Sequence, residues 1–107
     1  MATIVNDGNF EAEVLQSDKP VLVDFYADWC GPCKMMGPLV EAVAASREDR
    51  LKVCKLNVDD AQQTAGKYGV MSIPTFIFFK NGEEVHRMTG ALPQNTFEEE
   101  IKQVIGG

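Results

Sequence analysis

Three short apolar segments, spaced by stretches with helical periodicity, limit what this 107-residue sequence can fold into. They cover residues 21–27, 51–58 and 75–80. Each has the length of one strand. The run over 21–27 is typical of a strand buried on both faces of a sheet, whereas 51–58 is apolar on alternate sides, with Lys55 as the exception. Because helix-like stretches separate them, the pattern predicts an α/β fold.

Two helices are expected between these strands. Residues 34–48 carry apolar side chains at helical spacing, and Pro38 should kink that helix. A shorter helix should follow Asp59 or Asp60, acting as its N-cap, and should stop near Gly66.

The remaining segments complete the chain. They are a first strand over 2–5, a helix with Asn9 as N-cap and Phe10, Val14 and Leu15 on one face, an edge strand over 83–89, and a last helix from Pro93 to Gly106. Asn81-Gly82 favours a tight hairpin turn just before the edge strand.

The predicted architecture is one domain over residues 1–107, with a central mixed sheet of about five strands flanked by about four helices. Strands separated by a helix are expected to pair in parallel through right-handed crossovers. The last two strands should instead form an antiparallel hairpin, and the helices should cover both faces of the sheet.

Charge and hydropathy narrow the possible partners. The chain has 16 acidic and 10 basic side chains, a net charge of −6, and no Lys/Arg cluster, which argues against nucleic acid and anionic membranes. No apolar run approaches the ~20 residues of a membrane helix, and the N-terminus lacks the features of a secretory signal. We expect a cytoplasmic monomer, while a cleaved organellar transit peptide stays open.

Three cysteines allow more than one interpretation. Cys30 and Cys33 are closely spaced, whereas Cys54 stands alone and should be a small buried apolar residue. A zinc site would have to combine all three with His86, without the second closely spaced pair typical of such sites. A static disulfide is another alternative, and His86 is expected to be solvated.

The segment Trp29-Cys30-Gly31-Pro32-Cys33-Lys34 lies between a buried strand and the start of a helix. A helix N-terminus presents unpaired N–H groups and partial positive charge, which favour a thiolate over a thiol. We expect Cys30 to be the more exposed cysteine, so its thiolate form should be favoured most by the helix N-terminus. Such a pair can cycle between dithiol and disulfide through a mixed disulfide.

With these motifs the sequence resembles the thioredoxin family over essentially its whole length. Besides the cysteine segment, the resemblance rests on Val23-Asp24-Phe25, Pro38, Lys55-Leu56-Asn57-Val58-Asp59, Tyr68-Gly69-Val70, Ile73-Pro74-Thr75, Phe79-Lys80-Asn81-Gly82 and Gly90-Ala91. It implies the thioredoxin fold and a general protein-disulfide reductase. The sequence departs from the commonest pattern at Tyr26, where Trp is frequent, and at Met71-Ser72.

The resemblance also implies roles for individual residues. Cys30 would be the attacking thiolate, Cys33 the resolving thiol, and Ile73–Pro74 a cis peptide bond. The apolar surface for substrates would comprise Trp29, Gly31, Pro32, Ile73, Pro74, Gly90 and Ala91. No bound cofactor or metal is implied: electrons would come from NADPH through thioredoxin reductase, or from a ferredoxin-linked reductase. The other partners would be disulfide-containing proteins.

Asp24 is a carboxylate in the middle of an apolar strand. Burial without a partner disfavours the ionised form, so its pKa should be raised. An acid tuned toward neutrality can accept and return a proton, which suits deprotonation of Cys33. The resemblance assigns Asp24 that role, with Lys55 nearby.

Two other functions stay open. A thioredoxin-fold binding module or subunit would use the same apolar surface independently of its redox state. An oxidant or isomerase is disfavoured, because such relatives usually carry a histidine between the cysteines and work in oxidising compartments.

Overall fold

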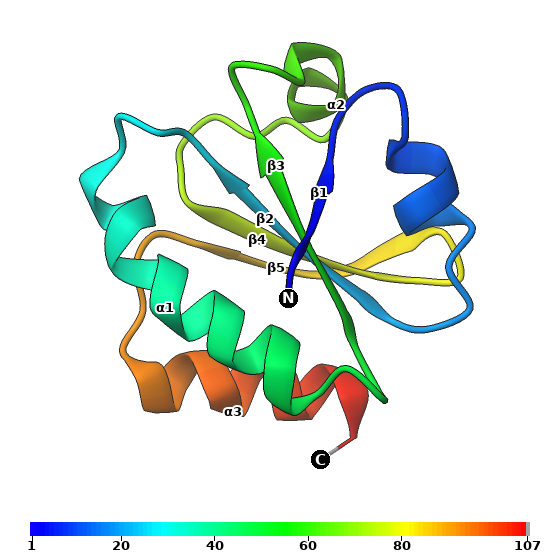
Figure 1. Cartoon of the computed structure of the whole chain (residues 1–107), viewed down its shortest axis with the longest axis vertical. Coiled ribbons are helices and arrows are strands. Elements are labelled where there is room, and N and C mark those ends of the chain that lie inside the picture. Colours follow the sequence, from blue (N-terminus) through cyan, green and yellow to red (C-terminus); the bar gives the residue numbers. More distant parts are fainter. Residues whose placement is uncertain (107) are drawn as a thin grey trace.

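The computed structural model describes residues 1–106 and centres on a five-stranded sheet of order β1-β3-β2-β4-β5 (Figure 1). In chain order the elements are β1 (Thr3–Val5), the π-helical η1 (Glu11–Leu15), β2 (Val21–Tyr26), α1 (Gly31–Ser46), β3 (Lys52–Asn57), α2 (Gln62–Lys67), β4 (Thr75–Lys80), β5 (Glu83–Thr89) and α3 (Gln94–Ile105). This order of strands and helices confirms the predicted mixed α/β fold.

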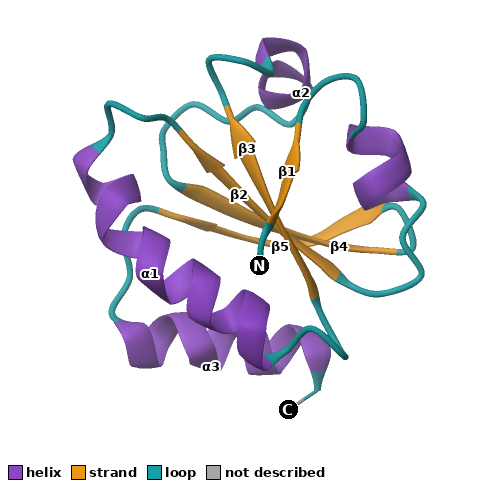
Figure 2. Ribbon diagram, viewed as in Figure 1, coloured by secondary structure: helices purple, strands orange, loops and turns teal. Residues whose placement is uncertain are grey.

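Helices cover both faces of the sheet, as predicted (Figure 2). On one face α1 and α3 pack through Met36, Val40, Val43, Ala44, Phe97 and Ile101. On the other face the segment leading into η1 contributes Phe10, η1 contributes Val14, and the start and interior of α2 contribute Ala61 and Ala65. Alternate residues of β2 and β3 therefore face two separate apolar cores.

The direction of β4 is the main correction to the predicted topology. β1 and β2 both pair in parallel with β3, as expected, but β4 pairs antiparallel with β2. A parallel crossover must carry the chain back along the whole strand, which takes a dozen or more residues. The six-residue α2 spans only about 9 Å, less than half the length of a six-residue strand. The chain therefore starts β4 at the end of the sheet where β3 stops.

The starts of η1 and α2 differ from the predictions, because the residues that accept backbone N–H groups there are not the expected N-caps. Asn9 does not cap η1: the side-chain oxygen of Asn6 accepts the backbone N–H of Asn9 instead, at 3.2 Å. Likewise α2 is capped by neither Asp59 nor Asp60. The carboxylate of Asp7, from the β1–η1 loop, accepts the backbone N–H and the hydroxyl of Thr64 at 2.8 and 2.7 Å.

α1 begins at Gly31, three residues before the predicted start, and continues through Pro38. Figure 1 shows the expected bend in this helix, since a proline nitrogen cannot donate the helical hydrogen bond. At the other end of the chain, Pro93 is the N-cap of α3 rather than its first residue, and Gly106 ends it at φ +82° as predicted.

The turn between β4 and β5 confirms the predicted hairpin. Asn81 and Gly82 have φ angles of +53° and +81°, and β5 is an edge strand of the sheet. Gly82 also lies against the η1 segment, because a Cβ atom at this position would be 3.0 Å from the carbonyl oxygen of Leu15.

Gly82→Ala is therefore expected to lower the free energy of unfolding by roughly 1–2 kcal/mol, the cost of a left-handed conformation for an L-residue. Gly66→Ala is the matched control, since Gly66 is helical and its new Cβ would meet nothing within 4 Å. It should raise stability by about 0.5–1 kcal/mol. Urea unfolding of both variants checks the pair, and equal midpoints would contradict the role given to Gly82.

Candidate active site

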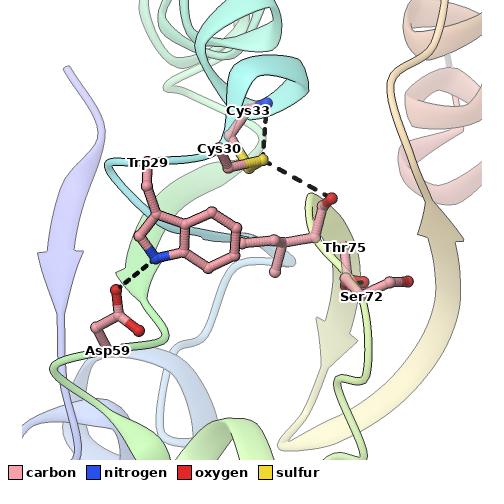
Figure 3. Close-up of a disulfide and its surroundings, with 7 residues drawn as sticks. Trp29, Cys30, Cys33, Asp59, Ser72 and Thr75 are labelled. Carbon is pink, nitrogen blue, oxygen red and sulfur yellow. Dashed lines mark hydrogen bonds between the residues drawn. A yellow bond between two sulfur atoms is a disulfide. The ribbon is translucent and has the colours of Figure 1, made fainter.

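Cys30 and Cys33 form a disulfide at the N-terminus of α1 (Figure 3). Cys30 is the N-cap residue, and its sulfur accepts a hydrogen bond from the backbone N–H of Cys33 at 3.2 Å. The two Cα atoms are 5.2 Å apart. Pro32 lies in the first turn of α1, where its missing N–H leaves no gap in the helix.

Both cysteines are buried, so the expectation that Cys30 is the more exposed is wrong for the disulfide form. Their exposed fractions are 5% for Cys30 and 6% for Cys33. The cause is a loop far along the chain: the carbonyl oxygen of Ile73 lies 3.8 Å from the Cys30 sulfur, and Ile73 packs against the cluster formed by Ala27, Cys30 and Cys33. The two sulfurs differ instead in their environment, because that of Cys30 accepts an N–H at the helix N-terminus.

The loop over the disulfide contains the cis Ile73–Pro74 bond that the resemblance implied. Hydrogen bonds hold it on both sides. The hydroxyl of Thr75 donates to the carbonyl oxygen of Ser72 at 2.6 Å, and the N–H of Gly90 donates to the carbonyl oxygen of Pro74 at 2.8 Å. The start of β4 and the end of β5 thus fix this loop beside α1.

Trp29 stands beside the disulfide with 70% of its surface exposed. Its indole N–H donates to a carboxylate oxygen of Asp59 at 2.9 Å (Figure 3). The sequence predicts for Asp59 only a helix-capping role, so this contact was missed. The available signal was the parallel pairing of β2 with β3, which places the residues after one strand beside those after the other.

The predicted substrate surface gathers around the disulfide at one end of the sheet. Of its residues, Trp29, Gly31, Pro32 and Ala91 are exposed, Ile73 and Gly90 are half-buried, and Pro74 is buried. A cavity of about 350 Å³ adjoins it, lined by Trp29, Val58, Val70, Met71, Ser72 and Ile73. Met71 is 94% exposed, so an apolar side chain stands free at the rim of this cavity.

Asp24 is buried in β2, with 2% of its surface exposed. Burial raises its pKa to about 7, while the positive charge of Lys55 lowers it and the negative charge of Glu41 raises it. Within residues 1–106 its Oδ1 atom has no hydrogen-bond partner. The raised pKa expected from the sequence is therefore present, and burial is its main cause.

Lys55 lies directly opposite Asp24 in the pairing of β2 with β3. Its ammonium group sits over the ring of Tyr26, 4.7 Å from the ring centre. In the described part of the chain, Lys55 and Asp24 form no ion pair within 4.0 Å. Lys55 therefore acts on Asp24 through space rather than by a direct bond.

Residues 1–103 match the family model for thioredoxin. The chain belongs to the thioredoxin family. It is 50% identical to Thioredoxin 2 of Chlorobaculum tepidum over 100 residues, which cover 94% of this chain and 92% of the relative. It is 48% identical to the thioredoxin of Porphyra purpurea over 101 residues (94% of both chains). The thioredoxin of Rickettsia bellii is 46% identical over 105 residues, covering 98% of this chain and 100% of its own.

Thioredoxins are thiol–disulfide oxidoreductases, and this member of the family carries the redox-active disulfide, Cys30–Cys33. Its activity is the reduction of disulfides by this cysteine pair. Figure 3 shows the groups that meet there: the N-terminus of α1, the indole of Trp29 and the loop before β4.

The other two sequence candidates lie outside this site. Cys54 is fully buried in β3, and burial raises its pKa to about 11. The positive charge of Lys52 lowers this pKa by a smaller amount. His86 was expected to be solvated, but it is only partly exposed and bonds Glu100 of α3 at 2.6 Å. Residues 1–106 contain no group of three or more metal-ligating side chains, and none of their helices is long and apolar enough to cross a membrane.

Proposed function

We propose that this chain is a general protein-disulfide reductase in which Cys30 attacks and Cys33 resolves. The observation that carries the proposal is the N–H of Cys33 directed at the Cys30 sulfur, at the N-terminus of α1. In the reduced pair, this N–H and the helix dipole stabilise negative charge on that sulfur, and the thiolate is the nucleophilic form.

The reaction consists of two displacements. The Cys30 thiolate attacks one sulfur of the substrate disulfide, so that a mixed disulfide forms and the other substrate sulfur leaves as a thiolate. Cys33, once deprotonated, attacks the Cys30 sulfur, closes the Cys30–Cys33 disulfide and releases the second substrate thiolate. Two electrons pass to the substrate, whose thiolates take up two protons.

In this scheme Asp24 takes the proton of Cys33. A pKa of about 7 suits a group that must accept a proton in one step and return it in another. Lys55, opposite Asp24 in the sheet, favours the ionised carboxylate and so keeps its pKa from rising further.

The substrate segment docks on the apolar surface formed by Trp29, Gly31, Pro32, Ile73, Pro74, Gly90 and Ala91. Trp29 is held in place by its bond to Asp59, which supports a fixed contact surface beside the disulfide. The half-buried Ile73 and the exposed backbone of Gly31 let an extended segment approach the sulfurs closely.

The proposal extends to the cellular setting. A thioredoxin reductase would reduce the oxidised chain with electrons from NADPH, or a ferredoxin-linked reductase would do so. No cofactor bound to the chain is needed, because the electrons reside on the two sulfurs. We place the protein in the cytoplasm as a monomer of one domain over residues 1–107. A 45% identical relative is the M-type chloroplastic thioredoxin of Pisum sativum, which makes an organelle the alternative location.

The test is the equilibrium reduction potential of the Cys30–Cys33 pair, followed by the fluorescence of Trp29, the only tryptophan. A two-electron transition within or below roughly −220 to −320 mV, the glutathione poise of the cytosol, supports a reductant. A transition near −120 to −180 mV would instead indicate an oxidant or isomerase. Cys33→Ser should show no such transition. A binding module would keep its function in a Cys30→Ser/Cys33→Ser double variant, which a reductase would not.

A further inference from the structure

Tyr26 makes two contacts near the active site, one with the cluster that holds the redox disulfide and one with the ammonium group of Lys55. It is the last residue of β2 and packs, half-buried, against the cluster formed by Ala27, Cys30 and Cys33. The face of its ring carries the Lys55 ammonium, 4.7 Å from the ring centre. The same residue thus packs against the cluster that contains the cysteine pair and holds the ammonium group of the lysine opposite Asp24.

The strand pairing gives Lys55 two alternative partners. Asp24 lies directly opposite Lys55, and Tyr26 lies diagonal to it on the same face of the sheet, since side chains alternate along a strand. A carboxylate and an aromatic face both attract an ammonium group. In the described chain the Lys55 ammonium group lies over the Tyr26 ring and forms no ion pair with Asp24 within 4.0 Å. Oδ1 of Asp24 is left buried and unbonded.

We propose that Tyr26 is a positioning residue for the resolving step: its ring holds the Lys55 ammonium off Asp24, which keeps Asp24 able to carry a proton. The inference rests on the proposed role of Asp24 as the base for Cys33. A lysine in direct contact would favour the ionised carboxylate and make it a weaker proton acceptor.

The other groups around Asp24 do not replace Lys55. From α1, Glu41 opposes ionisation of Asp24, and its carboxylate accepts the N–H of Ala2 at 3.2 Å. From β4, the residue opposite Asp24 is the uncharged Phe76. Burial raises the pKa of the Tyr26 hydroxyl, and the charges of Asp28, Asp24 and Asp60 raise it further, so the ring stays a neutral phenol.

The test is the titration of the Asp24 carboxyl carbon by ¹³C NMR in the disulfide form, in which the active-site cysteines do not titrate. Tyr26→Leu should lower the pKa of Asp24 by about one unit or more, because the freed Lys55 can pair with it. Tyr26→Phe keeps the aromatic face and should leave the pKa unchanged. In the reduced protein, Tyr26→Leu should move the pH midpoint of the resolving step down by the same amount.

A Lys55→Gln background is the matched control, because Tyr26→Leu should have no effect on Asp24 there. An equal shift in both backgrounds, or none in either, overturns the proposal. The ε-methylene protons of Lys55 supply a second measurement in the unmodified protein, independent of how the variants fold. The Tyr26 ring should shift them upfield, and unshifted resonances would show that the contact is absent in solution.

The same experiments separate this inference from the proposed function. If Tyr26→Leu lowers the pKa of Asp24 but the pH midpoint of the resolving step does not move, Asp24 is not the base for Cys33. The placement of Lys55 by Tyr26 then stands, and the proposed role of Asp24 falls. In the opposite case, the midpoint of the resolving step follows the pKa of Asp24 in Lys55→Gln, but Tyr26→Leu shifts neither the midpoint nor this pKa. The proposed role of Asp24 then stands, and the placement of Lys55 by Tyr26 falls.

Discussion

A Cys33→Ser variant is expected to stop after the first displacement and to accumulate a mixed disulfide with its substrate through Cys30. The Cys30 sulfur keeps its place at the N-terminus of α1, so attack still occurs, but no second thiol can release the product. Multiple turnover should fall by roughly 10³-fold or more, as when a nucleophile is removed from other enzymes. Mass spectrometry of the quenched reaction would measure the trapped adduct.

Cys30→Ser should lose turnover to the same extent but form no adduct, because the Cys33 sulfur does not receive the helix N–H that Cys30 receives. Cys54→Ala is the matched control. Cys54 is fully buried in β3 and belongs to a different apolar cluster from the reacting pair, so its replacement should leave turnover unchanged. Adduct formation through Cys33 in Cys30→Ser, at the rate seen through Cys30, would reverse the assigned roles.

Local patterns predicted the elements that depend on neighbouring residues. The bounds of β4 and β5 match the predicted 75–80 and 83–89, because Asn81-Gly82 marks the turn and both strands border it. That a helix starts at the cysteine pair was predicted for the same reason, since Gly31 and Pro32 sit inside the motif, although α1 begins at Gly31 and not at the predicted residue 34. These features need no information from distant parts of the chain.

Two of the mistakes concern contacts between residues far apart in the sequence. Asp7 caps α2 from across 57 residues, so no local pattern around Gln62 could show it. The Cys30 sulfur is covered by Ile73, 43 residues away, which is why the exposure of Cys30 was misjudged. The direction of β4 depends on the shortness of α2, a length that the sequence does indicate.

At the active site, the contacts that the sequence did not predict depend on the register between strands. Asp24 could be singled out because a carboxylate in an apolar strand is conspicuous. The bond from Trp29 to Asp59 and the position of Lys55 over Tyr26 both follow from the parallel pairing of β2 with β3. Once that register is known, both contacts can be anticipated.

Asp24→Asn is expected to stabilise the protein above pH 7 and to have little effect near pH 4. The pKa of Asp24 is about 7 in the folded chain, against 3.8 for an ordinary aspartate. Between these values the folded state binds the proton and the unfolded state does not, so stability falls as pH rises. The difference of about three units corresponds to about 4 kcal/mol lost between pH 4 and 7, and no further loss above it.

An asparagine at this position cannot ionise, so the variant should lack that decline. At pH 8 it should exceed the unmodified protein by roughly 2–4 kcal/mol, the lower end allowing for the buried amide. Urea unfolding of the disulfide form at pH 4.5 and pH 8 measures the effect. Asp18→Asn, at an exposed carboxylate, is the control and should show no such gain. An unmodified protein whose stability stays level between these pH values would mean that Asp24 ionises freely in the fold.

The same substitution should slow the resolving step, because the proposed base for Cys33 is lost. Removing a general base typically costs about 10²-fold or more, and the rate of the unmodified protein should rise through pH 7 as Asp24 loses its proton. Stopped-flow fluorescence of Trp29 can follow decay of the mixed disulfide in both proteins. Higher stability with an unchanged rate would mean that the buried carboxylate destabilises the fold without serving the reaction. Higher stability together with a slower resolving step would show that the carboxylate that destabilises the fold is also the group that takes the proton from Cys33.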